Sequence, residues 1–374
     1  MATVTSVGSG NYNTGSTWDS GARPGSSDDV VIASGHTVTL VQAENANSLD
    51  LQSGGTLDGD GNLLTIDGEN SSGFAVNLDG AISGTDTDIT ITTPAATNID
   101  LKATSGNVRN VTINHASCAA AIAGGFMTIT GNLTITAGSL NTGGNDLTVA
   151  GTTTVTGTLT CNASTVSLGS GYTGGYALLG NGTVNFGTGT NTVGAINTHS
   201  PSGITKTSGT ITFDTQKTGS QSIGPTVTSN NTHFDFGTST VNFDLSGGAG
   251  VKFAIEQHTG SSKTLTITAA TVNYKSDGYI YQNNTDTNIF KIIGDLVIDA
   301  SKTLETYYDN ADDFGSKLQV TGDVTLNGTL NAYSASNPKP MDFGSLTIGG
   351  SGTYKATSGT TTITDETTGG YGLI

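Results

Sequence analysis

The densest group of side chains able to do chemistry lies in LETYYDNADDF, residues 304–314. Four carboxylates stand there beside two tyrosines. Carboxylates accept hydrogen bonds from sugar hydroxyls, and aromatic faces offer a flat apolar surface on which a sugar ring packs. Two carboxylates held a fixed distance apart are also what glycosidic hydrolysis requires. Sugar binding, sugar cleavage and an exposed polar loop are the three interpretations of this stretch.

Of the two functional interpretations we favour binding, because nothing in the sequence places two carboxylates at a defined separation. Two tyrosines of the preceding aromatic-rich segment are added to the candidate site. No catalytic residue is assigned. The predicted glycan-binding residues are Tyr279, Tyr281, Tyr307, Tyr308, Asp309, Asp312 and Asp313.

The stretch most similar to a metal-binding loop is DGDGNLLTIDGE, residues 58–69. Its acidic and amide residues match positions 1, 3, 5 and 12 of an EF-hand, but position 6, which must be glycine, is Leu63. We therefore interpret it as a Gly/Asp turn between two strands and expect neither a metal nor a cofactor. The residues at the matching positions are Asp58, Asp60, Asn62 and Glu69.

Histidine and cysteine residues predict no further site. The five histidines are scattered and lack metal-ligand spacing. Cys118 and Cys161 are too few for a disulfide framework, so we interpret them as small buried residues and leave their pairing open.

Short strands must position any such site, because almost every window of the sequence alternates apolar and polar residues with a period of two. Gly, Asn or Asp separates the strands. Only HASCAAAIAGGF, residues 115–126, is a helix candidate, and its paired glycines weaken it. Clear strands are predicted within residues 36–40, 88–93, 127–136, 152–160, 263–274 and 323–330.

A short phrase recurs along the chain: Gly, then Asn, Asp or Ser, then an alternating strand. Close copies are 13, 22 or 28 residues apart. Such spacings suit a solenoid, in which a coil hides its apolar face only when the next coil stacks on it. The copies are GNLLTI (61–66), GNLTI (131–135), GNDLTV (144–149), GDLVI (294–298), GDVTL (322–326) and GSLTI (344–348).

A longer phrase combines a strand, a polar turn and a Gly-aromatic-small-aliphatic run. Its glycines are Gly73, Gly175, Gly278 and Gly370, at steps of 102, 103 and 92 residues. The fourth copy reaches Ile374 without room for the strand that follows the first two copies. We therefore expect the chain to continue beyond residue 374, or its edge to be completed by another subunit.

These patterns predict an all-β fold, an elongated parallel β-solenoid (β-helix) with an N-terminal cap. Tandem β-sandwiches are the alternative. We predict a cap or attachment segment at 1–40, coils at 41–232, an aromatic-rich β region at 233–308 and further coils at 309–374. Larger coils, an inserted sheet or a binding face would each account for the aromatic residues of the third segment.

Composition narrows the classes of partner. The 374 residues include 13 basic and 30 acidic side chains, for a net charge of −17. Such a surface repels phosphates, so we expect no nucleic-acid partner. No apolar run reaches membrane-spanning length, so we expect no membrane insertion. Thr-x-Thr pairs are typical of flat ice-binding faces as well, but their uneven spacing here argues against that function.

Several stretches resemble the Thr-, Gly- and Asn-rich β-solenoid class of phage tail fibres, tailspikes and bacterial surface adhesins. They are the cap TWDSGARPGSSDDVVIASGHTVTL (17–40), the Gly-[Asn/Asp]-Leu-Thr-Ile phrase and SGTTTITDETTGGYGLI (358–374). The resemblance covers the whole chain in style and transfers no catalytic residue. It implies a structural protein of a tailed-phage virion, a fibre or spike. It also implies a homotrimer, other virion proteins as partners, and contact with host-surface polysaccharide.

Two alternatives to the virion protein stay open. The first is a bacterial extracellular adhesin or self-assembling fibre subunit at the cell surface, which would assemble head to tail through its C-terminal edge. The second is a polysaccharide depolymerase, which would release oligosaccharide from capsule or lipopolysaccharide.

Overall fold

The chain folds as a parallel β-solenoid in a computed structural model that divides into two compact units. Unit 1 is Met1–Gly169 with Gly182–Asn185, and unit 2 is Ser170–Asn181 with Phe186–Ile374. The described residues are 1–83, 87–170, 176–198, 203–214, 221–222, 231–244, 253–254, 264–280, 289–306, 317–332, 340–356 and 359–364.

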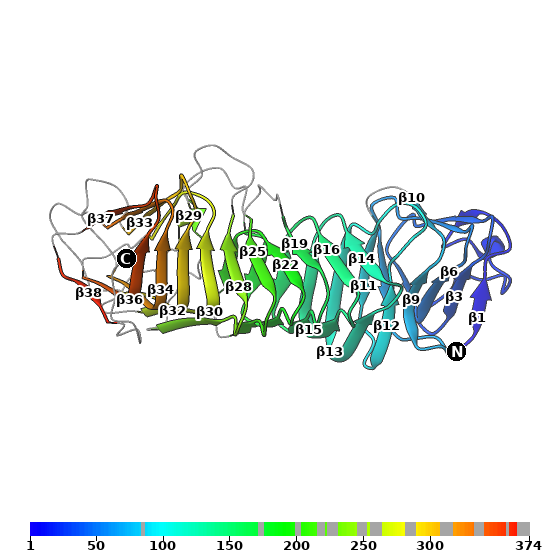
Figure 1. Cartoon of the computed structure of the whole chain (residues 1–374). Helices are drawn as coiled ribbons and strands as arrows, with labels where there is room; N and C mark the ends of the chain where they lie inside the picture. Colours follow the sequence, from blue (N-terminus) through cyan, green and yellow to red (C-terminus); the bar gives the residue numbers. More distant parts are fainter. Residues whose placement is uncertain are drawn as a thin grey trace. The chain divides into compact units, whose positions relative to one another are not determined.

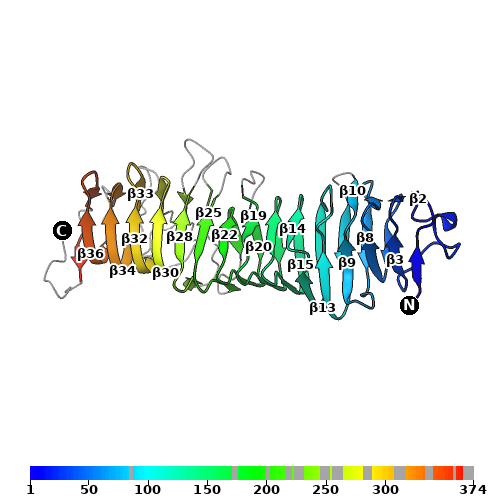
Figure 2. The ribbon, with the colours of Figure 1, turned by 45° about the vertical axis from the view of Figure 1, so that its right-hand side comes forward.

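In unit 1, successive strands visit three faces in turn, and each strand pairs in parallel with the equivalent strand of the next coil (Figures 1 and 2). Face 1 consists of β1 (Thr3–Thr5), β3 (Asp29–Ile32), β6 (Ser48–Leu51), β9 (Phe74–Leu78), β12 (Ala96–Asp100), the second parts of β13 (Asn110–Ile122) and β15 (Leu133–Asn141), β18 (Thr158–Thr160) and β21 (Thr183–Asn185). Face 2 consists of β2 (Gly10–Asn11), β4 (Thr37–Thr39), β7 (Thr56–Asp58), β10 (Ala81–Ser83), β14 (Phe126–Ile129), β16 (Asp146–Val149) and β19 (Val166–Leu168). Face 3 consists of β5 (Glu44–Ala46), β8 (Leu63–Ile66), β11 (Asp88–Ile91), the first parts of β13 and β15, and β17 (Thr153–Val155).

Unit 2 also has three faces of parallel strands. Its face 1 consists of β24 (Ile204–Thr205), β27 (Asn231–Asp235), the first parts of β30 (Thr264–Tyr274), β32 (Ile289–Ile298), β34 (Lys317–Leu326) and β36 (Met341–Ile348), and β38 (Thr361–Ile363). Its face 2 consists of β22 (Thr190–Val193), β25 (Thr210–Phe213), β28 (Thr240–Phe243) and the second parts of β30, β32, β34 and β36. Its face 3 consists of β20 (Leu178–Gly180), β23 (Ile196–Thr198), β26 (Gln221–Ser222), β29 (Phe253–Ala254), β31 (Gly278–Tyr279), β33 (Thr303–Glu305), β35 (Thr329–Asn331) and β37 (Thr353–Lys355).

The period-two alternation of the sequence explains the core. Alternate side chains point to opposite sides of a strand, so one set points into the solenoid and the other points outward. On face 3 of unit 1, Leu64, Ile89, Val111 and Leu133 occupy equivalent inward positions on successive coils and are fully or almost fully buried. Burying each such side chain stabilises the fold by about 1.5–3 kcal/mol.

Coil length varies while this register holds. Leu140 pairs with Leu159, 19 residues later, whereas Leu49 pairs with Val76, 27 residues later. The extra residues lie in the corners between faces, so the inward columns continue across coils of different length.

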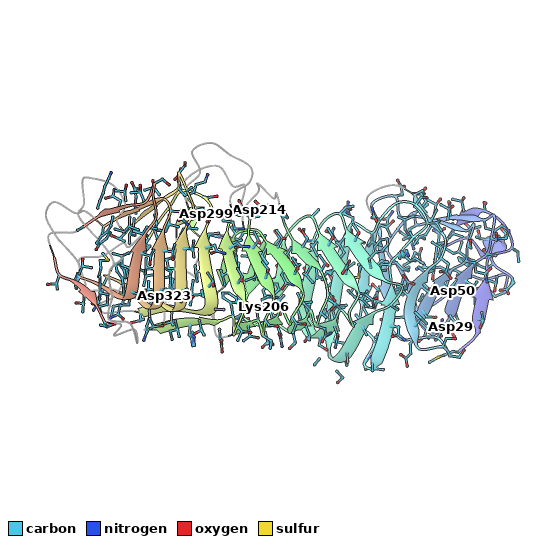
Figure 3. All side chains as sticks on the ribbon, in the orientation of Figure 1. Asp29, Asp50, Lys206, Asp214, Asp299 and Asp323 are labelled. Atoms are coloured by element: carbon cyan, nitrogen blue, oxygen red, sulfur yellow. The ribbon has the colours of Figure 1, made fainter. Side chains whose placement is uncertain are left out.

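The recurring Gly-Asx phrase forms corners. In unit 2, the backbone N–H of Asp323 (labelled in Figure 3) donates to Oδ1 of Asp295 in the preceding coil at 2.9 Å. The hydroxyl of Ser345 donates in turn to Oδ1 of Asp323 at 2.6 Å. A Cβ on Gly322 would lie only 2.2 Å from Oδ1 of Asp295, so this corner requires glycine. The phrase thus supplies a hydrogen-bond ladder that links one coil to the next.

The predicted N-terminal cap is confirmed. The 3₁₀ turn η1 (Gly15–Thr17) leads into Trp18, which is 2% exposed and packs edge-on against Tyr12, with ring centroids 5.2 Å apart. The indole N–H donates to the backbone oxygen of Tyr12 at 2.7 Å. Nearby, the buried Glu44 carboxylate pairs with Arg23 at 2.6 Å. Burial raises the pKa of Glu44, against the opposing effect of Arg23.

Aromatic residues of the predicted third segment fill the core of unit 2. Phe243 lies in register between Phe213 and Tyr274, with centroid distances of 5.4 and 4.9 Å. Phe234 and Phe236 are also buried and stack at 5.9 Å. Interior packing therefore accounts for these described aromatic side chains.

The weak helix candidate at 115–126 is a strand for most of its length. Residues up to Ile122 belong to β13, and a turn with Gly124 and Gly125 at positive φ follows. The side chains of Cys118 and Cys161 are buried, as predicted, and no disulfide joins them. In the described part of the chain, no helix has the length and apolar character needed to cross a membrane.

Asp342 gives unit 2 a specific acid sensitivity. Its carboxylate lies 2.6 Å from Nζ of Lys317 and accepts a hydrogen bond from the Gln319 amide at 2.8 Å. Burial acts to raise the pKa of Asp342, but the hydrogen bonds from Lys317 and Gln319 outweigh it and hold that pKa below 3.8. Because the folded-state pKa is the lower one, this stabilisation is present above the unfolded-state pKa. It is lost as the pH falls through the folded-state pKa.

We therefore expect Asp342→Asn to destabilise the protein by about 1 kcal/mol or less at pH 7. The difference from the unsubstituted protein should shrink as the pH falls below 3.8. Urea unfolding curves at a series of pH values measure it. Asp60→Asn, at an exposed turn, is the control and should show no such convergence. A difference for Asp342→Asn that stays constant with pH would contradict the assignment.

Candidate functional site

A shallow polar groove of about 340 Å³ lies on the outer side of face 3 in unit 1. Outward side chains of β8, β11, β13 and β15 line it, together with the corner residue before β15. Because parallel strands are about 4.8 Å apart, equivalent outward residues repeat at that spacing along the groove. The lining residues are Leu63, Asp88, Ile89, Thr90, Asn110, Thr112, Asn132 and Thr134.

One row of the groove consists of threonines. Thr90, Thr112 and Thr134 occupy equivalent positions on three successive coils, and Thr65 and Thr154 extend the row at its two ends. The hydroxyls of the three central threonines make no hydrogen bond to the described part of the chain. Each hydroxyl can both donate and accept, so the row offers a regular set of hydrogen-bonding groups to a ligand.

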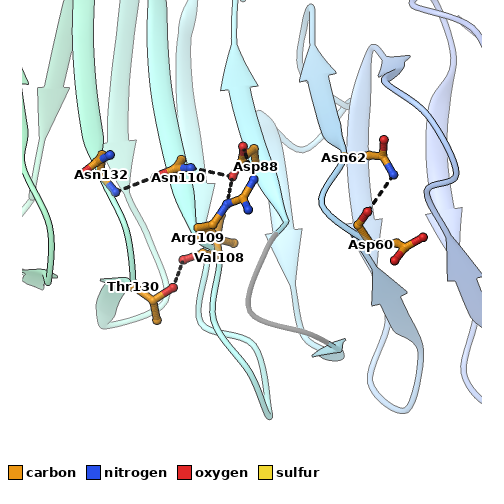
Figure 4. A network of polar contacts seen from close by, with 8 residues as sticks. All are labelled: Asp60, Asn62, Asp88, Val108, Arg109, Asn110, Thr130 and Asn132. Carbon is orange, nitrogen blue, oxygen red and sulfur yellow. Dashed lines mark hydrogen bonds and ion pairs between the residues drawn. The ribbon is translucent and has the colours of Figure 1, made fainter.

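The second row consists of a carboxylate and two amides, and its members bond to one another (Figure 4). The Asn110 amide donates to Oδ1 of Asp88 at 2.9 Å. Oδ1 of Asn110 accepts the backbone N–H of Asn132 at 2.8 Å, and Oδ1 of Asn132 accepts that of Thr152 at the same distance. These bonds fix the amide orientations, so the row is rigid before any ligand arrives.

Arg109 compensates the one carboxylate of the lining. Its guanidinium donates two hydrogen bonds to Asp88, from Nε to Oδ1 and from a terminal nitrogen to Oδ2, both at 2.8 Å. This bidentate geometry restricts the carboxylate to one orientation. Because the ion pair is partly exposed, solvent screens it and its main effect is positional.

This groove differs from the flat ice-binding face considered from the sequence. A Thr-x-Thr surface needs two threonine columns, whereas the neighbouring column here contains Asp88, Asn110 and Asn132. The coil lengths between the columns also vary, from 25 residues for Leu64 to Ile89 to 22 for Ile89 to Val111.

The glycan-binding residues predicted from the sequence stay a prediction. Tyr279 lies in β31, but its side chain is outside the described part of the structure. The other six residues lie outside the described residues altogether; they are Tyr281, Tyr307, Tyr308, Asp309, Asp312 and Asp313.

The loop similar to an EF-hand is a turn, as we interpreted it. It joins β7 to β8, with Asp60 and Gly61 at positive φ. The Asn62 amide donates to the backbone oxygens of Leu40 and Asp60 at 2.7 and 3.0 Å, the latter shown in Figure 4. Asn62 therefore serves the turn. Over the described residues, no group of three His, Cys, Asp or Glu side chains is placed to bind a metal.

The groove was missed in the sequence because no single stretch contains it. Asp88 and Arg109 are 21 residues apart, and Asn110 and Asn132 are 22 apart. A usable signal does exist: an Asx-x-Thr pattern recurs at 88–90, 110–112 and 132–134. Recognising it requires knowing that these three stretches stand side by side.

Comparison with protein-family models, curated proteins and solved structures produces no match to this chain. The argument for function therefore rests on the chemistry of the groove.

Proposed function

We propose that this chain is a structural component of a tailed-phage virion, a fibre or spike, whose face 3 groove binds a polysaccharide of the host surface. Its partners are further copies of itself, other virion proteins and that polysaccharide. The groove replaces the predicted tyrosine and aspartate cluster as the binding site for which structural support exists. The virion assignment rests on the resemblance described for the sequence.

The observation that carries the binding proposal is the pair of aligned rows. Thr90, Thr112 and Thr134 present hydroxyls, while Asp88 and Asn110 present oxygen acceptors and amide donors beside them. A polysaccharide is a repeating array of hydroxyls that both donate and accept. A rigid row of matching groups binds such an array at a low cost in conformational entropy.

The groove favours binding over cleavage. Of the described residues that line it, Asp88 alone carries a carboxylate. Both oxygens of that carboxylate are held by Arg109 and Asn110. Hydrolysis of a glycosidic bond by the common mechanisms needs two carboxylates flanking the bond. The depolymerase alternative therefore has no support from this site.

We expect Thr112→Arg, at the centre of the groove, to weaken polysaccharide binding at least about tenfold, which corresponds to 1.4 kcal/mol. The long side chain would cover the rows on both sides. Surface plasmon resonance against immobilised lipopolysaccharides and capsular polysaccharides measures the affinity. Thr148→Arg is the matched control, because Thr148 is an exposed, outward threonine on face 2 of the same unit.

Equal weakening by the two arginine variants would contradict the role of the groove. If the unsubstituted chain bound none of a broad panel, the polysaccharide proposal itself would fail. The virion assignment has a separate test: antibodies against the chain are expected to label phage particles in electron micrographs. Labelling of bacterial cell surfaces in place of particles would support the adhesin alternative.

A further inference from the structure

A lysine lies inside unit 2, where the coil interior is otherwise apolar. Lys206, which directly follows β24 and is labelled in Figure 3, is only 3% exposed. Its Nζ donates to the backbone oxygen of Gly189 at 2.6 Å and to Oδ1 of Asn191 at 2.5 Å. Burying an ammonium ion is costly, so a lysine in this position calls for an explanation.

Asn191 is equally unusual. It is fully buried in β22 at an inward position, and the equivalent positions of the following coils contain Ile211, Val241 and Val272. Its Oδ1 meets the lysine, but its Nδ2 is buried without a hydrogen-bond partner among the described residues. An unsatisfied amide nitrogen costs about 1–3 kcal/mol, so an apolar residue would serve the core better.

The geometry points to a covalent bond: we propose that Nζ of Lys206 and Cγ of Asn191 form an intramolecular amide that joins two successive coils of unit 2. With a C=O bond of about 1.23 Å, a contact of 2.5 Å to Oδ1 places Nζ within about 3.7 Å of Cγ. That separation is close to the distance of about 3–3.5 Å at which reacting groups are poised for attack.

The reaction balances without any cofactor or oxidant. The neutral amine of Lys206 attacks Cγ of Asn191, and a new Nζ–Cγ bond forms. One N–H proton passes from Nζ to Nδ2, the Cγ–Nδ2 bond breaks, and ammonia leaves. Oδ1 stays as the oxygen of the new secondary amide.

Burial favours both the reaction and its product. An apolar surrounding disfavours a charged amine, and the neutral amine is the nucleophile. Holding the two groups in contact removes the entropic cost of bringing them together, so a single slow turnover suffices. The product contains neither a buried charge nor the unsatisfied Nδ2, which accounts for both anomalies at once.

The bond would close a loop of 15 residues, one turn of the solenoid. Such a link restricts the unfolded chain in the same way as a disulfide, but reductants do not break it. It would suit a rod that must survive outside a cell. The proposal does not depend on the polysaccharide groove, which lies in the other unit.

Intact mass spectrometry of the purified full chain under denaturing conditions tests the proposal. We expect the observed mass to fall below the sequence mass by one ammonia molecule per chain. The Lys206→Met and Asn191→Ala variants should both have their full sequence masses. Trypsin should fail to cleave after Lys206 in the unsubstituted protein, because that side chain would no longer be a free amine.

Two results would overturn the proposal. The first is a full sequence mass for the unsubstituted protein. The second is an ammonia loss that persists in Lys206→Met, since that would show cyclisation of an asparagine on its own backbone. Asn191→Asp adds a positive check, because the same bond would then release one water molecule. Each readout is a mass, so none of them requires the variants to be as stable as the parent.

Discussion

Phe243→Ala is expected to lower the free energy of unfolding of unit 2 by about 3–5 kcal/mol, the usual cost of truncating a buried phenylalanine. The side chain is 1% exposed and lies between Phe213 and Tyr274 in the core column. Removing it costs the burial of the ring, leaves a cavity and breaks two ring contacts at once. Urea unfolding followed by circular dichroism measures the change.

Phe126→Ala is the matched control for that experiment. Phe126 is 42% exposed, and its main specific contact is Nζ of Lys102, 4.9 Å from the ring centroid. Losing an exposed cation–π contact costs about 0.5–1 kcal/mol. If the two variants were destabilised equally, the stacked aromatic column would not be the source of core stability that the structure indicates.

Gly294→Ala should destabilise unit 2 by about 2–4 kcal/mol, although it adds only one methyl group. Gly294 has φ = +133° at the corner between the two parts of β32, a conformation that side chains rarely adopt. A Cβ there would lie 1.8 Å from the backbone oxygen of Ala269 in the preceding coil. Either the corner or the coil before it must move.

Gly350→Ala separates this effect from the general effect of replacing glycine. A Cβ on Gly350 would have no neighbour within 4 Å, and its backbone is outside the positive-φ region. We expect its melting temperature to stay close to that of the parent, or to rise slightly because the unfolded chain loses freedom. A comparable drop for both variants in differential scanning calorimetry would argue against close coil stacking at Gly294.

Local pattern in the sequence was enough to predict the fold class. Inward residues such as Leu64 and Ile66 alternate with outward ones such as Thr65, and this alternation holds in nearly every strand. The recurring Gly-Asx phrase was correctly associated with successive coils. Its physical role, a side-chain oxygen of one coil accepting the backbone N–H of the next, appears only when Asp295 and Asp323 are seen together.

Contacts between coils could not be predicted, because their spacing in the sequence is irregular. Asp88 meets Arg109 after 21 residues, whereas Lys206 meets Asn191 after 15. Neither pair forms a motif of fixed length. The sequence drew attention to tyrosines and acids that are adjacent along the chain, whereas the groove is built from residues that are adjacent only across strands.

The uneven coils of unit 1 have a consequence for how such a chain can change over evolutionary time. Since the 19-residue and 27-residue repeats keep the same inward columns, insertions and deletions at corners leave the rest of the rod unaltered. One residue inserted within a strand would instead turn the remainder of that strand inside out. Corners are therefore the places where new loops, and with them new specificities, accumulate while the scaffold is conserved by its own geometry.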